Sequence, residues 1–452
     1  MARLFGTDGV RGVANKDLTA ELALQLSVGA AHVLGEAGAF EGGRPTALVG
    51  RDTRASGEFL EAAVIAGLAS AGVDVKRVGV VPTPGVAFLV SEHEADLGVM
   101  LSASHNPMPD NGIKFFQRGG VKLDDTLEDA IEERMGQSES WARPIGDKVG
   151  RVNDDLGAID AYVAHLVGSL GADSSLEGIK VVLDCANGAS SMTAPSAFQA
   201  QGAAVVAIHN NPDGLNINED CGSTHMGDLQ AKVVEVGADL GLAFDGDADR
   251  CLACDAQGNL VDGDQIIAIL ALALQSERKL HSDTVVATIM SNLGFVNAMK
   301  ANGIKVDQTK VGDRYVLESM NANGFTLGGE QSGHVIMSEF ATTGDGVLTG
   351  LHLAARMART GKTLAELASV MTRLPQTMIN VKGVDKLRAG IDPHVQQAVS
   401  RANKELGDAG RVVLRPSGTE PVVRVMVEAE TMERAEQVCQ ELAVIVQERV
   451  SL

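Results

Sequence analysis

The chain has 452 residues, of which 45% are hydrophobic and 21% charged, a composition typical of soluble globular proteins with buried cores. Its 38 Lys and Arg against 59 Asp and Glu give a net charge of −21, which argues against binding to nucleic acid or to anionic membranes. Only 3% of the residues are aromatic, too few for a nucleic-acid stacking platform. At about 150 residues per domain, the length suggests roughly three domains.

The cysteines and the absence of long apolar runs predict a cytosolic protein. Five cysteines do not make a disulfide framework, since one must stay unpaired within the chain. Cys251 and Cys254 have C-x-x-C spacing, but no second Cys or His pair completes a zinc site, so we interpret them as core residues. The polar, Gly-rich start does not resemble a secretion signal, and no run approaches 18 apolar residues.

Short apolar runs alternate with helical patterns along most of the chain, which predicts layered α/β domains. In chain order, the first strands are expected at Thr46–Val49, Lys76–Val81 and Leu97–Leu101, with a helix over Glu58–Ala71 that ends at Gly72. The same rhythm predicts later strands at Ile179–Asp184, Ala203–Ile208, Leu240–Phe244 and Thr284–Met290. The last segment is expected to form strands Met378–Val381 and Val422–Val427, then a helix over Arg434–Glu448.

Candidate domain boundaries lie where the composition changes. The segment Asp124–Asp155 is rich in acids, Gly and Ser and is expected to form a helix followed by a linker. Further boundaries are expected near Asp255–Asp262 and near Arg373–Gln376, where Pro375 interrupts the pattern.

The first unusual loop, S-A-S-H-N-P at residues 102–107, directly follows the expected strand Leu97–Leu101. Ser104 at a strand end, followed by His105, can act as a nucleophile or a phosphate carrier. The loop lacks the G-x-S-x-G pattern of a hydrolase nucleophile elbow. An ordinary turn rich in Ser, Asn and Pro explains the loop about equally well.

The second loop, D-G-D-A-D-R at 245–250, places three carboxylates at alternate positions after a buried strand. Asp245, Asp247 and Asp249 repel one another unless they are solvated or share a cation, and hard oxygen ligands favour magnesium or calcium. An EF-hand is excluded because its sixth position would be Arg250 and its twelfth Ala256. The alternative is a solvated acidic turn, but α/β folds place ligands at this end of a strand.

The third loop, G-G-E-Q-S-G-H at 328–334, sets Glu330, Ser332 and His334 among glycines that allow a ligand to approach closely. A carboxylate, a hydroxyl and an imidazole suit hydrogen bonding to sugar hydroxyls. A Gly-rich hairpin turn explains the loop nearly as well.

The fourth loop, R-P-S-G-T-E-P at 415–421, lies between the expected strands Val412–Leu414 and Val422–Val427. The Arg415 guanidinium and two hydroxyls around a glycine favour a site for a phosphate dianion, and Arg424 could add a second guanidinium. An ordinary β-turn is the alternative.

Together the four loops predict phosphoryl transfer on a sugar, which depends on positioning and on charge neutralisation. The cations of this acidic chain are concentrated in or beside these motifs, at Arg11, Lys114, Arg250, Arg415 and Arg424.

All four loops occur in the order found in the α-D-phosphohexomutase superfamily, which the chain resembles over essentially its whole length. The opening F-G-T-D-G-V-R-G at 5–12, the S-A-S-H-N-P loop and the G-E-Q-S-G-H run are similar to the branch that acts on glucosamine phosphates. Relatives that act on glucose or mannose phosphates usually carry T-A-S-H-N-P. The alternative is therefore a phosphoglucomutase or phosphomannomutase with the same machinery.

The resemblance implies four domains around a central cleft, three of them similar α/β domains with mixed sheets and the last a smaller α+β domain. We expect their bounds at 1–150, 151–256, 257–373 and 374–452. It implies that Ser104 carries the phosphoryl group and, with the three aspartates, binds one Mg²⁺. It also implies catalytic roles for Arg11, His105 and Lys114, and substrate binding by Arg250, Glu330, Ser332, His334, Arg415, Ser417, Gly418, Thr419 and Arg424.

The implied reaction interconverts α-D-glucosamine 6-phosphate and α-D-glucosamine 1-phosphate through a 1,6-bisphosphate, and its product feeds UDP-N-acetylglucosamine and cell-wall synthesis. A hexosamine or glucose 1,6-bisphosphate is the expected activator, and a kinase or autophosphorylation would supply the first phosphate. The sequence is compatible with a homodimer and does not determine the oligomeric state. Some relatives carry a histidine in the loop equivalent to Lys310–Arg314, and this chain has none there. Lys114 is our first candidate for the general acid and base, with an exposed strand-end lysine as the alternative.

Overall fold

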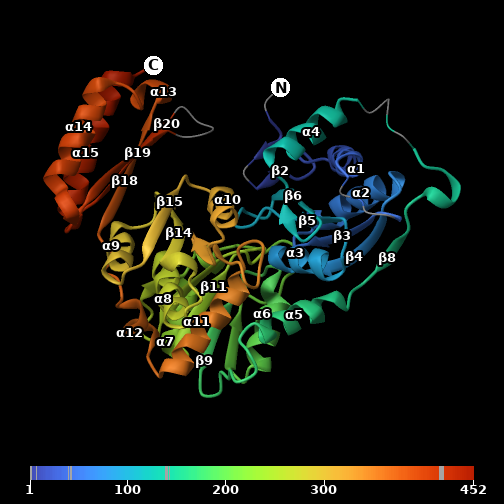
Figure 1. The fold of residues 1–452 in the computed structure, drawn as a ribbon, viewed down its shortest axis with the longest axis horizontal. Helices are drawn as coiled ribbons and strands as arrows, with labels where there is room; N and C mark the ends of the chain where they lie inside the picture. Colours follow the sequence, from blue (N-terminus) through green and yellow to red (C-terminus); the bar gives the residue numbers. More distant parts are fainter. Residues whose placement is uncertain are drawn as a thin grey trace.

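The computed structural model describes residues 3–6, 8–38, 40, 43–137, 141, 143–416 and 422–452, and it contains four sheets in succession along the chain. Figure 1 shows the first and last of these units at opposite sides of the molecule, with the two middle units below and between them. The expected α/β architecture of four domains is confirmed, so the three domains suggested by length alone were one too few.

Domain I holds an eight-stranded mixed sheet in the order β1-β2-β6-β5-β3-β4-β8, with β7 paired to β6. Its β5 lies in the middle of this sheet, parallel to β3 and antiparallel to β6, so the loop after β5 starts at a central position. The strands are Phe5–Gly6 (β1), Gly9–Val13 (β2), Thr46–Arg51 (β3), Asp74–Val80 (β4), Leu97–Leu101 (β5), Asp110–Gln117 (β6), Val121–Lys122 (β7) and Val152–Asp154 (β8). The helices are Ala20–Glu36 (α1), Ser56–Ser70 (α2), Thr83–Glu92 (α3) and Asp125–Met135 (α4).

Domain II has a five-stranded sheet in the order β10-β9-β11-β12-β13. The run L-G-L-A-F of β11 is buried at every position, as expected for a central strand covered on both faces. Both C-x-x-C cysteines are buried in the neighbouring strand β12, which fits their interpretation as core residues. The elements are Ala158–Gly168 (α5), Lys180–Asp184 (β9), Ser190–Ala200 (α6), Ala204–Ile208 (β10), Gly227–Val236 (α7), Leu240–Phe244 (β11), Cys251–Asp255 (β12) and Leu260–Val261 (β13).

Domain III has a four-stranded sheet in the order β15-β14-β16-β17. Its first helix begins at a capping box, in which Asp262 accepts from the Gln265 N–H and the Gln265 side chain accepts from the Asp262 N–H. The elements are Gly263–Ser276 (α8), Thr284–Thr288 (β14), Leu293–Ala301 (α9), Lys305–Thr309 (β15), Asp313–Asn323 (α10), Leu327–Gly329 (β16), Val335–Met337 (β17), Gly346–Thr360 (α11) and Leu364–Ala368 (α12).

Domain IV has a three-stranded antiparallel sheet in the order β18-β20-β19 and a hydrophobic core of its own. The last helix is two residues longer at each end than the sequence predicts. The elements are Gln376–Lys382 (β18), Lys386–Ala389 (α13), Pro393–Leu406 (α14), Arg411–Pro416 (β19), Val422–Glu428 (β20) and Met432–Val450 (α15).

Domains II and III share one continuous hydrophobic core, which includes Phe198 of α6, Ile266 of α8 and Leu351 of α11. Helix α3 of domain I joins this core through Val86, whereas most of domain I packs around a separate core. The loops at the carboxyl ends of the central strands are therefore anchored in packed sheets. Across the described residues, none of the helices is both long and apolar enough to cross a membrane.

Candidate active site

Ser104 lies in a strained turn directly after β5 and is 1% exposed. Its φ of 52° is in the left-handed region, which is uncommon for a residue other than glycine and is found often at functional sites. The Ser104 hydroxyl donates to Asp245 Oδ2 at 2.5 Å and lies 3.3 Å from His105 Nδ1. The turn thus directs the hydroxyl across the domain boundary toward the aspartate loop of domain II.

A fully buried arginine holds this turn in place. Arg54 donates to the carbonyl oxygens of Ser104, Asn106, Pro107 and Asp110 over 2.6–3.0 Å and pairs with Asp52 at 2.9 Å. The carbonyl of Ser104 also accepts from Asn218 Nδ2 of domain II at 2.8 Å. Charge-assisted hydrogen bonds to so many carbonyls fix a backbone shape that the turn would not hold by itself.

Ser102 is fully buried beneath the turn, where its hydroxyl donates to Asp52 Oδ2 at 2.6 Å and accepts from the Ser104 N–H at 3.0 Å. These contacts occupy the hydroxyl in the scaffold. Its position therefore favours Ser104 as the phosphate carrier.

The three aspartates after β11 converge on one point. One oxygen from each of Asp245, Asp247 and Asp249 lies within 4.8 Å of the others, and all three side chains are buried. Ala248 at the turn of this loop has a φ of 57°. Gly246 is needed there, because a Cβ at that position would lie 2.6 Å from the Ser104 carbonyl oxygen.

The donor set fits a divalent cation. Burial, together with Asp249 and Asp247, raises the pKa of Asp245 well above its usual range. Among the described residues, the buried Oδ1 atoms of Asp247 and Asp249 have no hydrogen-bond partner. Buried carboxylate oxygens are costly to leave unsatisfied, and hard oxygen donors of this kind are the ligands of magnesium and calcium.

Lys114 lies inside the site, at 2% exposure, so the alternative of an exposed strand-end lysine is wrong. Its ammonium contacts Asp247 Oδ2 and Asp8 Oδ2, each at 2.7 Å. Burial alone would lower the pKa of Lys114, but Asp247 and Asp8 outweigh it and raise the pKa above its usual value. Lys114 is therefore held as a cation next to the aspartate loop.

A cavity of about 420 Å³ opens beside these groups, and domains I, II and III all contribute to its wall. Seven predicted site residues line it: Arg11, His105, Asp249, Arg250, Glu330, Ser332 and His334. Burial, Arg250 and Arg11 lower the pKa of His105 to about 4, which leaves its imidazole neutral at pH 7.

His334 lies in the wall of this cavity with its ring nitrogens engaged by protein groups. Its Nε2 accepts from the Gly344 N–H at 3.1 Å, and its Nδ1 lies 3.7 Å from Asp249 Oδ2. The ring is 3% exposed. The histidine is thus placed to orient Asp249, and Glu330 and Ser332 of the same loop also line the cavity.

In domain IV, Arg415 of β19 and Arg424 of β20 lie directly opposite each other in the antiparallel ladder. Burial and Arg424 lower the pKa of Arg415, which Glu330 partly offsets. Neither guanidinium has an ion-pair partner among the described residues, and Arg424 Nε is buried without a hydrogen bond there. Two adjacent unpaired guanidiniums favour an anion. Ser417, Gly418 and Thr419, the other predicted members of this site, lie outside the described residues.

Several residues of the site were not singled out from the sequence. Asp8 belongs to the opening motif, so the motif itself was the available signal. Arg54, Lys122 and Asp313 carry no local signal, because their partners lie far away in the sequence.

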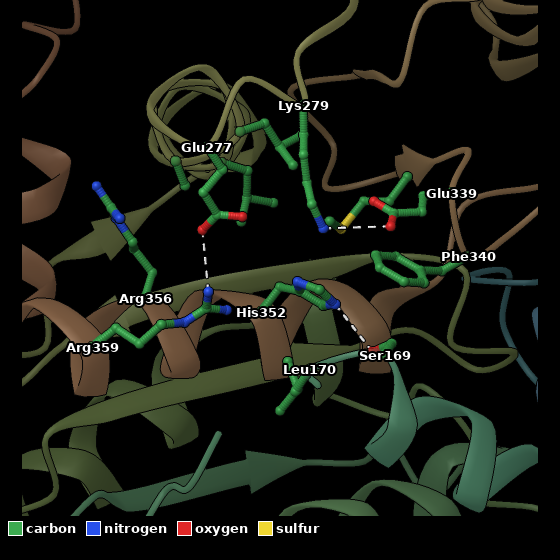
Figure 2. Close-up of a pocket in the computed structure, with 13 residues that line it drawn as sticks. Ser169, Leu170, Glu277, Lys279, Glu339, Phe340, His352, Arg356 and Arg359 are labelled. Atoms are coloured by element: carbon green, nitrogen blue, oxygen red, sulfur yellow. Dashed lines mark hydrogen bonds and ion pairs between the residues drawn. The ribbon is translucent and has the colours of Figure 1, made fainter. Parts of the chain in front are cut away.

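A second cavity lies between α8, α11 and the end of α5, outside the site (Figure 2). Its charges are largely paired: Lys279 lies 3.4 Å from Glu339, and Arg359 lies 3.1 Å from Glu277. His352 Nε2 lies 3.0 Å from Ser169 Oγ. None of the predicted site residues lines this cavity.

A second cluster of potential ligands, Asp184, His209 and Cys221, lies in domain II. His209 Nδ1 lies 3.1 Å from Asp184 and its Nε2 lies 3.4 Å from Asp228, so both nitrogens face carboxylates. This is the geometry of an imidazolium ion pair. The Asp184 carboxylate, together with Asp228, raises the pKa of His209 above its ordinary value of 6.5.

We expect this pair to make stability depend on pH. Because the folded-state pKa is raised, the contribution is fully present below about pH 6.5, the pKa of an unfolded histidine, and is lost as the pH rises through the folded-state value. The free energy of unfolding of the wild type, minus that of His209→Gln, should therefore shrink with rising pH. Urea denaturation at several pH values measures it, with the exposed His394→Gln as control. A difference that stays constant from pH 5 to pH 8 would contradict the pairing.

Comparison with known proteins matches four family models in order along the chain. They are described as phosphoglucomutase/phosphomannomutase domain I over residues 2–141, domain II over 160–258, domain III over 262–374 and the C-terminal domain over 362–445. A phosphoglucosamine mutase from Cutibacterium acnes is 77% identical over 452 residues, covering 100% of both chains.

Two solved structures share the fold. A phosphoglucomutase/phosphomannomutase family protein from Burkholderia thailandensis has a TM-score of 0.83 at 24% identity, covering 100% of this chain and 99% of the other. The N-acetylphosphoglucosamine mutase of Aspergillus fumigatus, solved in complex with GlcNAc-6P and magnesium, has a TM-score of 0.67 at 17% identity, covering 98% and 95%. With the family models and the full-length relative, we conclude that the chain belongs to the phosphoglucomutase/phosphomannomutase family and, within it, to the phosphoglucosamine mutases.

Proposed function

We propose that this protein interconverts α-D-glucosamine 6-phosphate and α-D-glucosamine 1-phosphate through phosphorylated Ser104 and a 1,6-bisphosphate intermediate. The observation that carries the proposal is the contact of Ser104 Oγ with Asp245 at 2.5 Å, at the edge of a buried triad of aspartates. A hydroxyl in that position can carry a phosphoryl group whose oxygens complete the same cation site. We place the reaction in the cytoplasm, where its product would supply UDP-N-acetylglucosamine synthesis.

We propose one Mg²⁺ at the aspartate triad. Asp245, Asp247 and Asp249 would hold it, with an oxygen on Ser104 as a further ligand. A bound magnesium ion neutralises charge on the transferring phosphoryl group. The fungal relative solved with magnesium supports this choice of metal.

The charged residues around the triad have distinct proposed roles. Lys114, held as a cation between Asp8 and Asp247, would neutralise charge on the transferring phosphoryl group rather than exchange a proton, in contrast to its predicted role as general acid and base. Arg11 and Arg250 line the cavity and would attract the phosphosugar into an otherwise acidic protein. His105, neutral and 3.3 Å from Ser104 Oγ, is placed to exchange a hydrogen bond with the reacting oxygen.

The sugar ring and the phosphate that is not being transferred would bind at two separate sites. Glu330 and Ser332 line the cavity and would bind sugar hydroxyls. Arg415 and Arg424, with Ser417, Gly418 and Thr419, would hold the phosphate that is not being transferred. After the first transfer the bisphosphate would reorient, so that its other phosphate faces Ser104.

Turnover of three substrates tests the proposal against its alternatives. We expect kcat/KM for glucosamine 6-phosphate to exceed that for glucose 6-phosphate and mannose 6-phosphate. A higher kcat/KM for glucose 6-phosphate or mannose 6-phosphate would instead indicate a phosphoglucomutase or phosphomannomutase. Release of free phosphate at the rate of substrate loss would indicate a phosphatase.

Arg415→Ala should mainly weaken binding of the phosphosugar. One charge-assisted contact is worth about 1.5–3 kcal/mol, so KM should rise about ten- to a hundredfold. Steady-state kinetics in both directions measures the effect, with Arg401→Ala, an exposed arginine of the same domain, as control. If KM for both phosphosugars were unchanged, Arg415 would have no part in binding phosphate.

A further inference from the structure

A largely buried lysine joins domain I to domain III beside the active site. Lys122 Nζ, on β7, donates to Asp8 Oδ1 at 2.9 Å and also to Asp313 Oδ2 at the start of α10. All three side chains are nearly buried, with exposures of 12%, 16% and 15% in the order Lys122, Asp8, Asp313. Figure 1 shows α10 at the edge of domain III that faces the strands of domain I.

Asp313 belongs to the segment 312–314, which contacts domain I. The same segment also contacts Glu330 in the loop 328–334, the sugar loop. The next residue, Arg314, donates to Glu128 of α4 at 2.9 Å. The preceding N–H, of Gly312, donates to Glu330 Oε1 at 3.1 Å. The position of the proposed sugar-binding carboxylate therefore depends on where this segment sits.

Lys122 is also connected, through Asp8, to the aspartate loop that is proposed to bind the metal. Asp8 Oδ2 binds Lys114, which also contacts Asp247, so Lys122 and Lys114 share one carboxylate. On the other side, Asp313 Oδ2 lies 3.9 Å from His334 Nε2. Charges of alternating sign thus run from the aspartate loop through Asp8 and Lys122 to the segment that holds Glu330.

We propose that Lys122 is a positioning residue. Its ion pairs hold the sugar loop of domain III at the distance from Ser104 that the reaction requires. The proposal rests on the proposed function, because the distance matters only if both groups act on one sugar. Without the ammonium, Asp8 would keep Lys114 and Arg11, whereas Asp313 would lose its cation. A largely buried carboxylate left unpaired is strongly unfavourable, and it would move away from the like charge of Asp8. Glu330 would move with it.

Lys122→Met should therefore lower kcat and raise KM for glucosamine 6-phosphate, reducing kcat/KM about tenfold to a hundredfold, as expected when reacting groups are misplaced by about 1 Å. Lys122→Arg should retain more activity, because the charge remains. The double variant Lys122→Met/Asp313→Asn should be more active than Lys122→Met alone, because the unpaired carboxylate is removed. The variants are compared at a temperature at which each is fully folded, so that the rescue reports the position of the loop and not the amount of folded protein.

Thr342→Val is the matched control. Thr342 Oγ1 donates at 2.6 Å to the carbonyl of Gly120, which lies in the same hairpin as Lys122. This variant therefore removes a contact between domain I and domain III but leaves the ion pairs of Lys122 in place. We expect near wild-type kcat/KM for it and a comparable loss of melting temperature. Lys122→Met kinetics equal to the wild type, or a double variant no better than Lys122→Met, would overturn the proposal. A wild type that does not isomerise phosphosugars would instead refute the proposed function.

Discussion

Replacing Ser104 with alanine should abolish turnover while leaving the fold intact. The Ser104 hydroxyl donates directly to Asp245, and the loss of a nucleophile costs several orders of magnitude in kcat. The turn itself is held by Arg54 through backbone carbonyls, so the side chain is not needed to maintain it. Coupled-assay kinetics and circular dichroism together measure the outcome. A loss of only a few-fold would refute the covalent mechanism.

Ser102→Ala is the informative companion to that experiment. Ser102 is the other serine of the loop, and its hydroxyl bridges Asp52 and the Ser104 N–H. Its removal should lower stability and disturb the turn, yet phosphate should still be found on Ser104. Peptide mapping by mass spectrometry identifies the modified serine, and phosphate on Ser102 in the wild type would reverse the assignment.

Removing the divalent cation should produce the other large effect. Excess chelator should lower activity about a hundredfold or more, because a metal ion contributes several kcal/mol of charge stabilisation. Mg²⁺ should restore activity better than Ca²⁺, which accepts looser geometry. Titration calorimetry gives a readout independent of turnover: Asp247→Asn should weaken Mg²⁺ binding, whereas Asp173→Asn, an exposed aspartate of the same domain, should not. Full activity in excess chelator would show that the triad binds no metal ion needed for turnover.

The strands and the loops that follow them could be predicted from the sequence. β5 and β11 have the predicted bounds, since both are short apolar runs bounded by polar loops. Ser104 and Asp245 follow strands of two different sheets, so it was the combined chemistry of the four loops, and not strand order, that suggested a shared site. Ends of elements were less predictable: β14 ends at Thr288 rather than Met290, because the chain leaves the sheet and turns into the cavity wall.

The polar framework of the site could not be predicted from local patterns. Lys122 and Asp313 are 191 residues apart and form a pair only after two domains have docked. Arginine is usually exposed, yet Arg54 is fully buried, because its guanidinium donates to four backbone carbonyl groups. Lys114 was a candidate acid and base that the sequence could not distinguish from an exposed strand-end lysine, because the acids that bind it come from other segments. Such contacts depend on tertiary structure, which propensity does not encode.

The central claim is that Ser104 must carry a phosphoryl group before the enzyme can act. The most direct measurement is to remove the phosphate with a phosphatase, confirm the loss by intact mass, and assay glucosamine 6-phosphate isomerisation with and without glucose 1,6-bisphosphate. We expect no activity without the bisphosphate, and recovery with it as Ser104 is phosphorylated again, because the donor runs the first half-reaction in reverse. Full activity of the stripped enzyme without bisphosphate, and with Ser104 still unmodified, would contradict the cycle.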